Sequence, residues 1–254
     1  MDYFLYRNGS LYAEDVAVAD IAAAVGTPFY VYSTATLLRH FKLFDDALAD
    51  MDHLICYAMK AASNQAIIKT LAQAGAGMDV VSGGEYARAK AAGVSTDRIV
   101  FSGVGKTVDE ITTALKGGIR QFNVESEPEM AVLNRVAGEM GVIAPITVRV
   151  NPDVDAKTHA KIATGMSGNK FGIPISRARK VYETAGAMPH LDVIGIDVHI
   201  GSQLTDLAPF ELAYQKVAEL AEQLRFDGHD IRRLDLGGGL GIPYVQSNEA
   251  PPLP

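Results

Sequence analysis

The sequence predicts an α/β protein whose strands and helices alternate around a (β/α)8 barrel of the TIM type. One unit repeats along the chain: a short β-forming apolar run, then glycine or polar residues, then an alanine-rich stretch with helical spacing. Seven such units follow one another, which predicts a parallel sheet, either as a barrel or as a doubly wound sheet. The length of 254 residues suits one large domain of either kind.

The expected strands are the apolar runs at 54–58, 77–81, 99–101, 121–124, 146–150, 193–200 and 233–236. Apolar residues at helical spacing predict helices between them, at about 62–75, 83–92, 107–117, 126–140, 175–186 and 207–226. Two segments do not fit the repeat. Residues 1–26 carry short apolar pieces of their own, so we expect them to pack on something other than the barrel wall. Residues 151–174 form a connection long enough to suggest a functional loop.

Composition narrows the class of protein. The formal charge is −7 without a basic cluster, which argues against a nucleic-acid partner. No apolar run approaches the roughly 20 residues that span a bilayer, and the N-terminus lacks the pattern of a signal peptide, so we expect no membrane partner and a cytoplasmic location. The single cysteine, Cys56, fits a reducing compartment and, inside an apolar run, is expected to be a core residue.

Polar residues and glycines follow most of the predicted strands. Because the carboxyl ends of parallel barrel strands lie on one face, these residues are expected to converge there. They are Lys60, Asp79, Glu85, Arg149, His199, Ser202, Gly237, Gly238 and Gly239.

Each of these residues has a chemical use if the ligand is an aromatic aldehyde that carries a phosphate. A lysine at the end of a buried strand can lose its proton and condense with a carbonyl group, so Lys60 is a candidate Schiff-base residue. Three consecutive glycines let backbone N–H groups approach a phosphate. His199 can stack on a ring or move a proton. The alternatives are a solvated lysine, a tight glycine turn, a structural histidine, and a helix cap at Asp79.

Longer motifs connect these residues to a known family. The motifs are Tyr57–Ala61, Gly77–Glu85, Phe122–Ser126, Arg149–His159, Thr164–Gly165, Lys170–Ile173, His199–Gln203 and Leu236–Gly241. Over residues 27–245 the chain resembles the pyridoxal-phosphate enzymes of the alanine racemase fold, and among them the diaminopimelate decarboxylases. The loop motif from Arg149 to His159, with Lys170–Ile173, is the part most typical of that branch.

The resemblance implies roles for the candidate residues. Lys60 would hold pyridoxal 5'-phosphate covalently and His199 would stack on its ring, which makes these two the expected catalytic residues. Ser202 and Gly237 to Gly239 would bind the phosphate, and Asp79, Glu85 and Arg149 would line the pocket. The implied reaction is decarboxylation of meso-diaminopimelate to L-lysine by a homodimer.

The chain also departs from that family. A Glu-Pro-Gly-Arg motif on the following strand and a C-terminal β-domain are absent from the sequence. We therefore expect residues 27–254 to form a barrel cut short before its last strand, and residues 1–26 to be the segment that would pack on the missing β-domain. Because a seven-stranded sheet leaves two edges unpaired, we expect this chain alone to be poorly soluble and to have little or no decarboxylase activity.

Two other functions stay open at this stage. One is decarboxylation of another basic amino acid, of the ornithine or arginine type. The other is a pyridoxal-phosphate-binding protein without turnover. A metal enzyme is disfavoured, because the six histidines show no paired ligand spacing.

Overall fold

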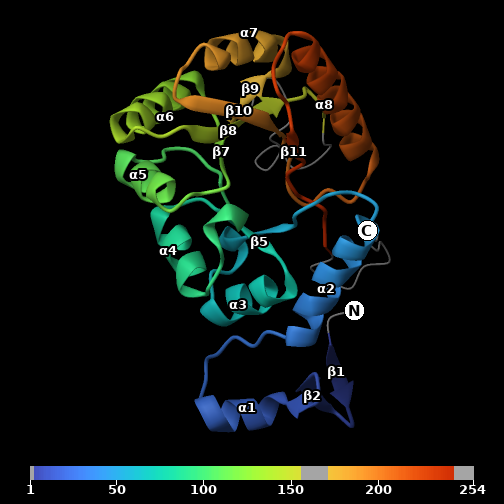
Figure 1. The fold of residues 1–254 in the computed structure, drawn as a ribbon. Coiled ribbons are helices and arrows are strands. Elements are labelled where there is room, and N and C mark those ends of the chain that lie inside the picture. The colour runs from blue at the N-terminus through green and yellow to red at the C-terminus, as the bar shows by residue number, and fades with distance from the viewer. Residues whose placement is uncertain (1–2, 156–170, 243–254) are drawn as a thin grey trace.

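A computed structural model describes residues 3–155 and 171–242 (Figure 1). Seven parallel strands form one curled sheet in the order β11-β10-β8-β7-β6-β5-β4. Their bounds are β4 (Cys56–Ala58), β5 (Gly77–Val80), β6 (Ile99–Phe101), β7 (Gln121–Val124), β8 (Ala144–Asn151), β10 (Leu191–Asp197) and β11 (Arg233–Asp235). A two-residue strand, β9 (Ile173–Pro174), pairs with the end of β8. The predicted parallel barrel is confirmed, with β4 and β11 at the two ends of the strand path.

Helices cover the outer face of the curl (Figure 1). They are α3 (Gln65–Ala74), α4 (Gly83–Ala91), α5 (Val108–Lys116), α6 (Glu127–Met140), α7 (Ile175–Gly186) and α8 (Ala208–Phe226), within a few residues of the predicted bounds. Several begin at a side-chain cap, which explains why they start just after a strand end. Thr107 and Glu110 form a reciprocal capping box, and Ser82 and Ser126 each accept a backbone N–H.

Strand side chains alternate between the helices and the barrel interior. On β8, Ile146, Val148 and Val150 belong to the fully buried apolar core. Between them lie Thr147 and Arg149, which make polar contacts with strands β7 and β10. This period of two places the apolar core between sheet and helices and leaves a polar layer inside the curl.

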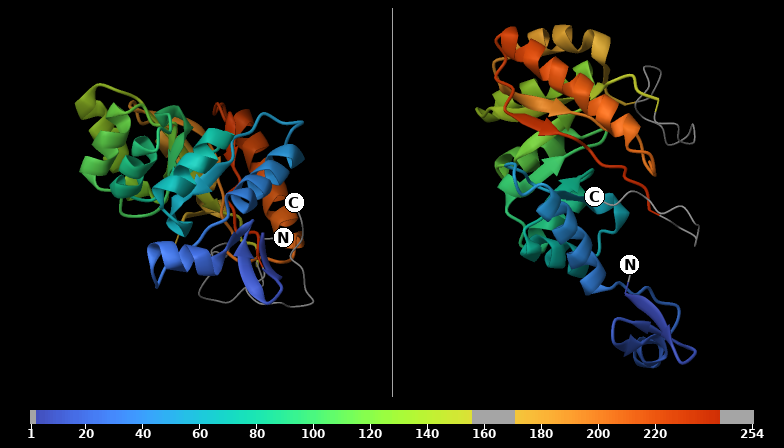
Figure 2. Two further views of the ribbon diagram at one scale, coloured as in Figure 1. Left: turned by 90° about the horizontal axis from the view of Figure 1, so that it is seen from below. Right: turned by 90° about the vertical axis from the view of Figure 1, so that its right-hand side faces the viewer.

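The N-terminal residues form a separate small unit (Figure 2). It contains an antiparallel sheet of β1 (Phe4–Arg7), β2 (Ser10–Ala13) and β3 (Val16–Ala17), followed by α1 (Val18–Val25). Its link to the barrel side is Glu14, whose carboxylate accepts hydrogen bonds from the Ser33 hydroxyl (2.7 Å) and the Ala35 N–H (2.9 Å) at the start of α2 (Thr34–Ala47). These contacts join the unit to α2, and the expectation that residues 1–26 pack on a separate β-domain stays a prediction.

Three details differ from the predictions. Helix α2 packs on α3 but was not predicted. The run expected as a buried strand at 54–58 is only half-buried, because β4 lies at the end of the strand path and has one strand neighbour. The strands expected at 193–200 and 233–236 end earlier, at Asp197 and Asp235, so the residues that follow them lie in loops.

Candidate functional site

The glycine run after β11 forms a tight loop. Its first turn is held by Asp235, whose Oδ1 accepts the Gly237 N–H at 3.1 Å. Gly237 and Gly239 have φ angles of +67° and +108°, which side chains rarely allow. A Cβ at Gly237 would overlap the Val198 carbonyl oxygen, whereas Gly238 has open space around it. The loop therefore needs glycine and leaves its centre open to a ligand.

The segment that contains Ser202 runs beside this loop. The Leu204 N–H donates to the Gly239 carbonyl at 2.9 Å, and the Gly241 N–H donates to the Leu204 carbonyl at 2.8 Å. Ser202 itself is exposed. The predicted neighbourhood of Ser202 and the three glycines is thus present in the structure.

His199 lies between the glycine loop and the strand ends. Its Nδ1 accepts the Gly238 N–H at 3.4 Å. Burial, together with the positive charges of Arg149 and Lys60, lowers the pKa of His199 to about 4. The imidazole is therefore neutral at pH 7, and both cations lie within electrostatic range of it.

Arg149 reaches the same region from β8. Its Nη1 donates to Glu125 Oε1 at 2.7 Å, and the two side chains are only 11% and 2% exposed. Its guanidinium also lies over the Phe171 ring, 5.5 Å from the ring centroid. The sequence had identified Arg149, but not Glu125 as the carboxylate that balances its charge.

Lys60 and Asp79 are the candidate site residues on the side of β4 and β5. Lys60 lies in a single 3-10 turn, Met59–Ala61, and is exposed, so the expected burial of this lysine is wrong. The pKa of Asp79 is raised to about 6, because burial and the negative charge of Asp235 outweigh the Ser102 hydrogen bond and the positive charge of Lys60, which lower it. Asp79 does not cap the next helix, because Ser82 does so.

Glu85 has a structural contact in addition to its place near the site. Its Oε2 accepts the Val81 N–H at 2.8 Å, just before α4 begins. The negative charge of Glu85 also raises the pKa of Asp79, which places it near that carboxyl group. Glu85 therefore fixes the β5–α4 turn and faces the same side as Asp79.

A second set of polar residues lies deeper in the curl. Asn123 on β7 donates to Asp235 Oδ2 at 2.9 Å, across the interior from one strand to another that is not its neighbour. Asp197 is 5% exposed, and burial raises the pKa of this carboxyl group well above its usual value. The sequence signal for this layer was the alternation of polar residues at Gln121, Asn123 and Glu125, and at Asp197 and His199.

Buried polar atoms without a hydrogen-bond partner gather at the same end of the barrel. Within residues 3–155 and 171–242 five such side-chain atoms occur, and four lie on or just after β5, β7 and β8. They are Asp79 Oδ1, Glu125 Oε2, Arg149 Nε and Asn151 Oδ1. Since unpaired buried polar groups are costly, their concentration makes this end of the barrel the candidate binding site for a polar ligand.

Cys56 does not act as a nucleophile at neutral pH, because burial raises the pKa of its thiol to about 12.

Across the described ranges, no cluster of three or more His, Cys, Asp or Glu side chains has the arrangement of a metal site. Likewise, none of the helices described here is long and apolar enough to cross a membrane.

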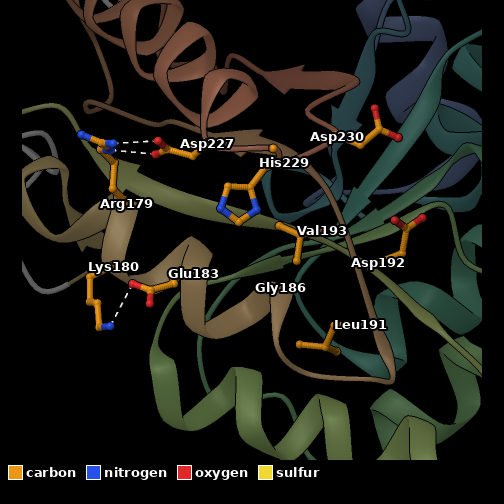
Figure 3. A pocket seen from close by; sticks show the side chains of 11 residues that line it. Arg179, Lys180, Glu183, Gly186, Leu191, Asp192, Val193, Asp227, His229 and Asp230 are labelled. Carbon is orange, nitrogen blue, oxygen red and sulfur yellow. Dashed lines mark hydrogen bonds and ion pairs between the residues drawn. The ribbon is translucent and has the colours of Figure 1, made fainter.

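A different hollow, of about 760 Å³, lies at the opposite ends of the strands (Figure 3). It is bounded by α7, the start of β10 and the connection from α8 to β11, and includes Leu191, Val193 and His229. Its most prominent cation, Arg179, is paired with Asp227 at 2.7 and 2.8 Å. None of the residues predicted for the site lines this hollow.

Comparison with known proteins identifies the class. Residues 34–253 match the family described as pyridoxal-dependent decarboxylase, pyridoxal binding domain, and the chain belongs to that family. The family's cofactor is pyridoxal phosphate. The open glycine loop and the unpartnered polar atoms at the strand ends fit a group with a phosphate and a polar aromatic ring.

Within the family, the chain is similar to diaminopimelate decarboxylases. It is 56% identical to the Vibrio cholerae enzyme of that name over all of this chain and 61% of the relative. The Helicobacter pylori enzyme complexed with L-lysine is 42% identical with a TM-score of 0.88, over 91% of this chain and 59% of that one. The M. jannaschii enzyme in co-complex with L-lysine gives 37% and 0.91, over 97% and 59%. The chain thus spans about 60% of the length of these relatives.

Proposed function

We propose that this protein acts in the decarboxylation of meso-diaminopimelate to L-lysine with pyridoxal phosphate. The observation that carries the proposal is the similarity of the whole chain to diaminopimelate decarboxylases at about half identity. Lysine, the product implied, is the ligand in two similar solved structures. By analogy with that family, we also propose a cytoplasmic homodimer.

The geometry supports specific roles for the chain's own residues. The exposed Lys60 amine is accessible to the cofactor aldehyde, and the glycine loop with Ser202 offers backbone and hydroxyl donors to its phosphate. The neutral His199 ring can stack on an aromatic ring without adding charge. When bound, pyridoxal phosphate supplies a ring that stabilises the negative charge left as CO2 departs.

Acidic and basic side chains around the proposed cofactor site set the charge there. Asp79, with a pKa of about 6, can hold or release a proton near neutral pH beside Lys60. Arg149 is held by Glu125, and its charge adds to the effect of burial, which lowers the pKa of His199 and keeps the ring neutral. Glu85 is proposed to line the pocket while it fixes the turn after β5.

We also propose a division of the chain into two parts. The resemblance supports residues 27–254 as the cofactor-binding barrel portion and residues 1–26 as a unit that packs on a separate β-domain. The link through Glu14 shows how that unit is attached to α2.

A substrate panel tests the reaction. Because this chain alone is expected to have little or no activity, the panel uses the polypeptide extended to the full length of its relatives. It is loaded with cofactor and offered meso-diaminopimelate, L-ornithine and L-arginine, with CO2 and amine products measured. We expect L-lysine from meso-diaminopimelate and no product from the other two. Release of CO2 from ornithine or arginine would favour the second kind of decarboxylase, and bound cofactor without any turnover would favour a binding protein.

Covalent attachment tests the site independently. Borohydride reduction of the loaded protein followed by peptide mass analysis should place the cofactor's mass on the peptide that contains Lys60. Lys69 on α3, which is also exposed, gives the matched control peptide. Label on Lys69, or label retained after Lys60→Ala, contradicts the proposed site.

A further inference from the structure

We propose that Asn123 is a positioning residue that sets the shape of the glycine loop through Asp235. The inference rests on the proposed function, in which that loop binds the cofactor's phosphate. Asn123 lies on β7, inside the barrel, and is not among the residues expected to touch the cofactor. Its part is to orient a carboxylate that in turn orients the loop.

Every hydrogen-bonding position of the Asn123 side chain is used. The amide is 2% exposed, and its Nδ2 donates to Asp235 Oδ2 at 2.9 Å and to the Ser102 hydroxyl at 3.0 Å. Its Oδ1 accepts from the Thr147 hydroxyl at 2.7 Å and from Gln121 Nε2 at 2.9 Å. Gln121 Nε2 also donates to Asp235 Oδ2 at 3.4 Å, so it faces Asn123 Oδ1 as a donor and fixes which way the Asn123 amide faces.

Asp235 transmits this orientation to the loop. One carboxylate oxygen, Oδ2, accepts from Asn123, and the other, Oδ1, accepts the Gly237 N–H at 3.1 Å. The second bond joins a side chain to the backbone two residues ahead, which is the pattern of an Asx turn. Rotation of the carboxylate away from Asn123 would therefore release the first turn of the glycine loop.

The position of β11 makes this support necessary. The strand has three residues, and β10 is its partner in the described sheet. Strands β8 and β10 separate β11 from β7 along the sheet, so the Asn123–Asp235 bond crosses the interior. A second cross-connection runs from Arg233 Nη1 to the Arg120 carbonyl at 3.1 Å. These two bonds hold β11 on the side where it has no strand neighbour in the described sheet. The glycine loop begins at the end of this strand.

The test compares two ligands that differ only in the phosphate. Dissociation constants for pyridoxal phosphate and for pyridoxal are measured by absorbance titration on the wild-type protein and on Asn123→Ala. We expect the wild type to bind pyridoxal phosphate more tightly than pyridoxal. In the variant, the ratio of the two affinities should fall about tenfold, while its affinity for pyridoxal stays unchanged. Equal weakening of both ligands would indicate a general structural role and would overturn the inference.

A reciprocal exchange tests the direction of the bond. Asn123→Asp places two carboxylates face to face, and Asp235→Asn leaves one oxygen to serve two donors, so each single variant should lose the preference. In the Asn123→Asp/Asp235→Asn double variant, position 235 can donate to position 123 and still accept the Gly237 N–H. We expect the double variant to recover most of the preference. A double variant that loses as much of the preference for pyridoxal phosphate as the single variants do contradicts the proposed positioning role of Asn123.

Two further variants separate folding from positioning. Thr147→Val removes only one donor to Asn123 and should lower the preference by about threefold in a protein that stays folded. Asn134→Ala removes an amide on α6 that accepts the His190 N–H, away from the loop, and should leave it unchanged. A wild type without any preference would refute the phosphate cradle itself. A wild type with a preference that both Asn123→Ala and Thr147→Val retain would refute only the role of Asn123.

Discussion

The two ends of the barrel differ in whether their polar groups have partners. At the carboxyl ends of the strands, buried atoms of Asp79, Glu125 and Arg149 have no hydrogen-bond partner among the described residues. At the other end, a hollow of about 760 Å³ lies beside α7, yet its charges are matched in surface pairs such as Arg179–Asp227 and Lys180–Glu183 (Figure 3). The difference teaches that unsatisfied buried polarity locates a site better than the volume of a hollow.

The largest expected effect comes from Lys60→Ala. In the polypeptide extended to the full length of its relatives, removal of the covalent attachment point should lower decarboxylase activity by roughly 10³-fold or more, measured as CO2 release. Lys69→Ala is the matched control and should keep wild-type activity. Comparable losses in the two variants would break the distinction between the strand-end rim and the rest of the surface.

The next effect concerns the buried pair on that rim. Glu125→Ala leaves Arg149 as an uncompensated buried charge and should lower the free energy of unfolding by about 3–5 kcal/mol, measured by urea denaturation. Glu139→Ala removes the partner of Arg135 in an exposed pair on α6 and should cost less than about 1 kcal/mol. Similar costs for both would show that the rim pair is solvated.

Two rim residues should give opposite dependences of stability on pH. The folded pKa of Asp79, about 6, exceeds its ordinary value of 3.8, so its contribution to stability falls as pH rises from about 4 to 6. The folded pKa of His199, about 4, lies below 6.5, so its contribution rises with pH over about 4 to 6.5.

Each variant should remove its own dependence. Relative to wild type, Asp79→Asn should gain roughly 2–3 kcal/mol between pH 4 and pH 7, and His199→Asn should lose a similar amount over the same interval. Thermal or urea unfolding at the two pH values measures both. Parallel shifts in the two variants would mean that the groups are not desolvated as the structure places them.

The smallest effect is expected at the opposite hollow. Arg179→Ala breaks an exposed ion pair and should change the free energy of unfolding by less than about 1 kcal/mol, with cofactor affinity unchanged. A titration with pyridoxal phosphate provides the measurement. A marked loss of cofactor affinity would reverse the functional assignment of the two ends.

Much of the barrel was predictable from sequence because its strands are short apolar runs with glycine or polar residues after them. The predicted centres of all seven strands and of the six barrel helices are confirmed. Helix α2 was missed although Ser33 caps it and Leu37 and Phe41 pack against the core at helical spacing. Its position before the first strand placed it outside the repeat on which the prediction relied.

The site was predictable where a polar residue directly follows a strand, and less so where it lies within one. Lys60 and His199 each follow a strand, whereas Arg149 lies within β8, and the charges of Lys60 and Arg149 both act on His199. Asn123 and Asp235 were missed because their importance depends on two strands, β7 and β11, that face each other across the curl although β8 and β10 separate them in the sheet. The exposure of Lys60 depends on which strand lies at the end of the path, and no local pattern encodes that.

The long connection after β8 begins and ends at one place. Asn151 Nδ2 donates to the Phe171 carbonyl at 2.6 Å, and Val150 pairs with Ile173. Gly172, with φ +77°, lies so close to Arg149 that a Cβ would come within 3.0 Å of the Arg149 carbonyl oxygen. These bonds hold the two ends of the connection together beside the end of β8. Because loop closure costs little more as length grows, insertions or deletions between Asn151 and Phe171 should leave the register of the barrel strands unchanged.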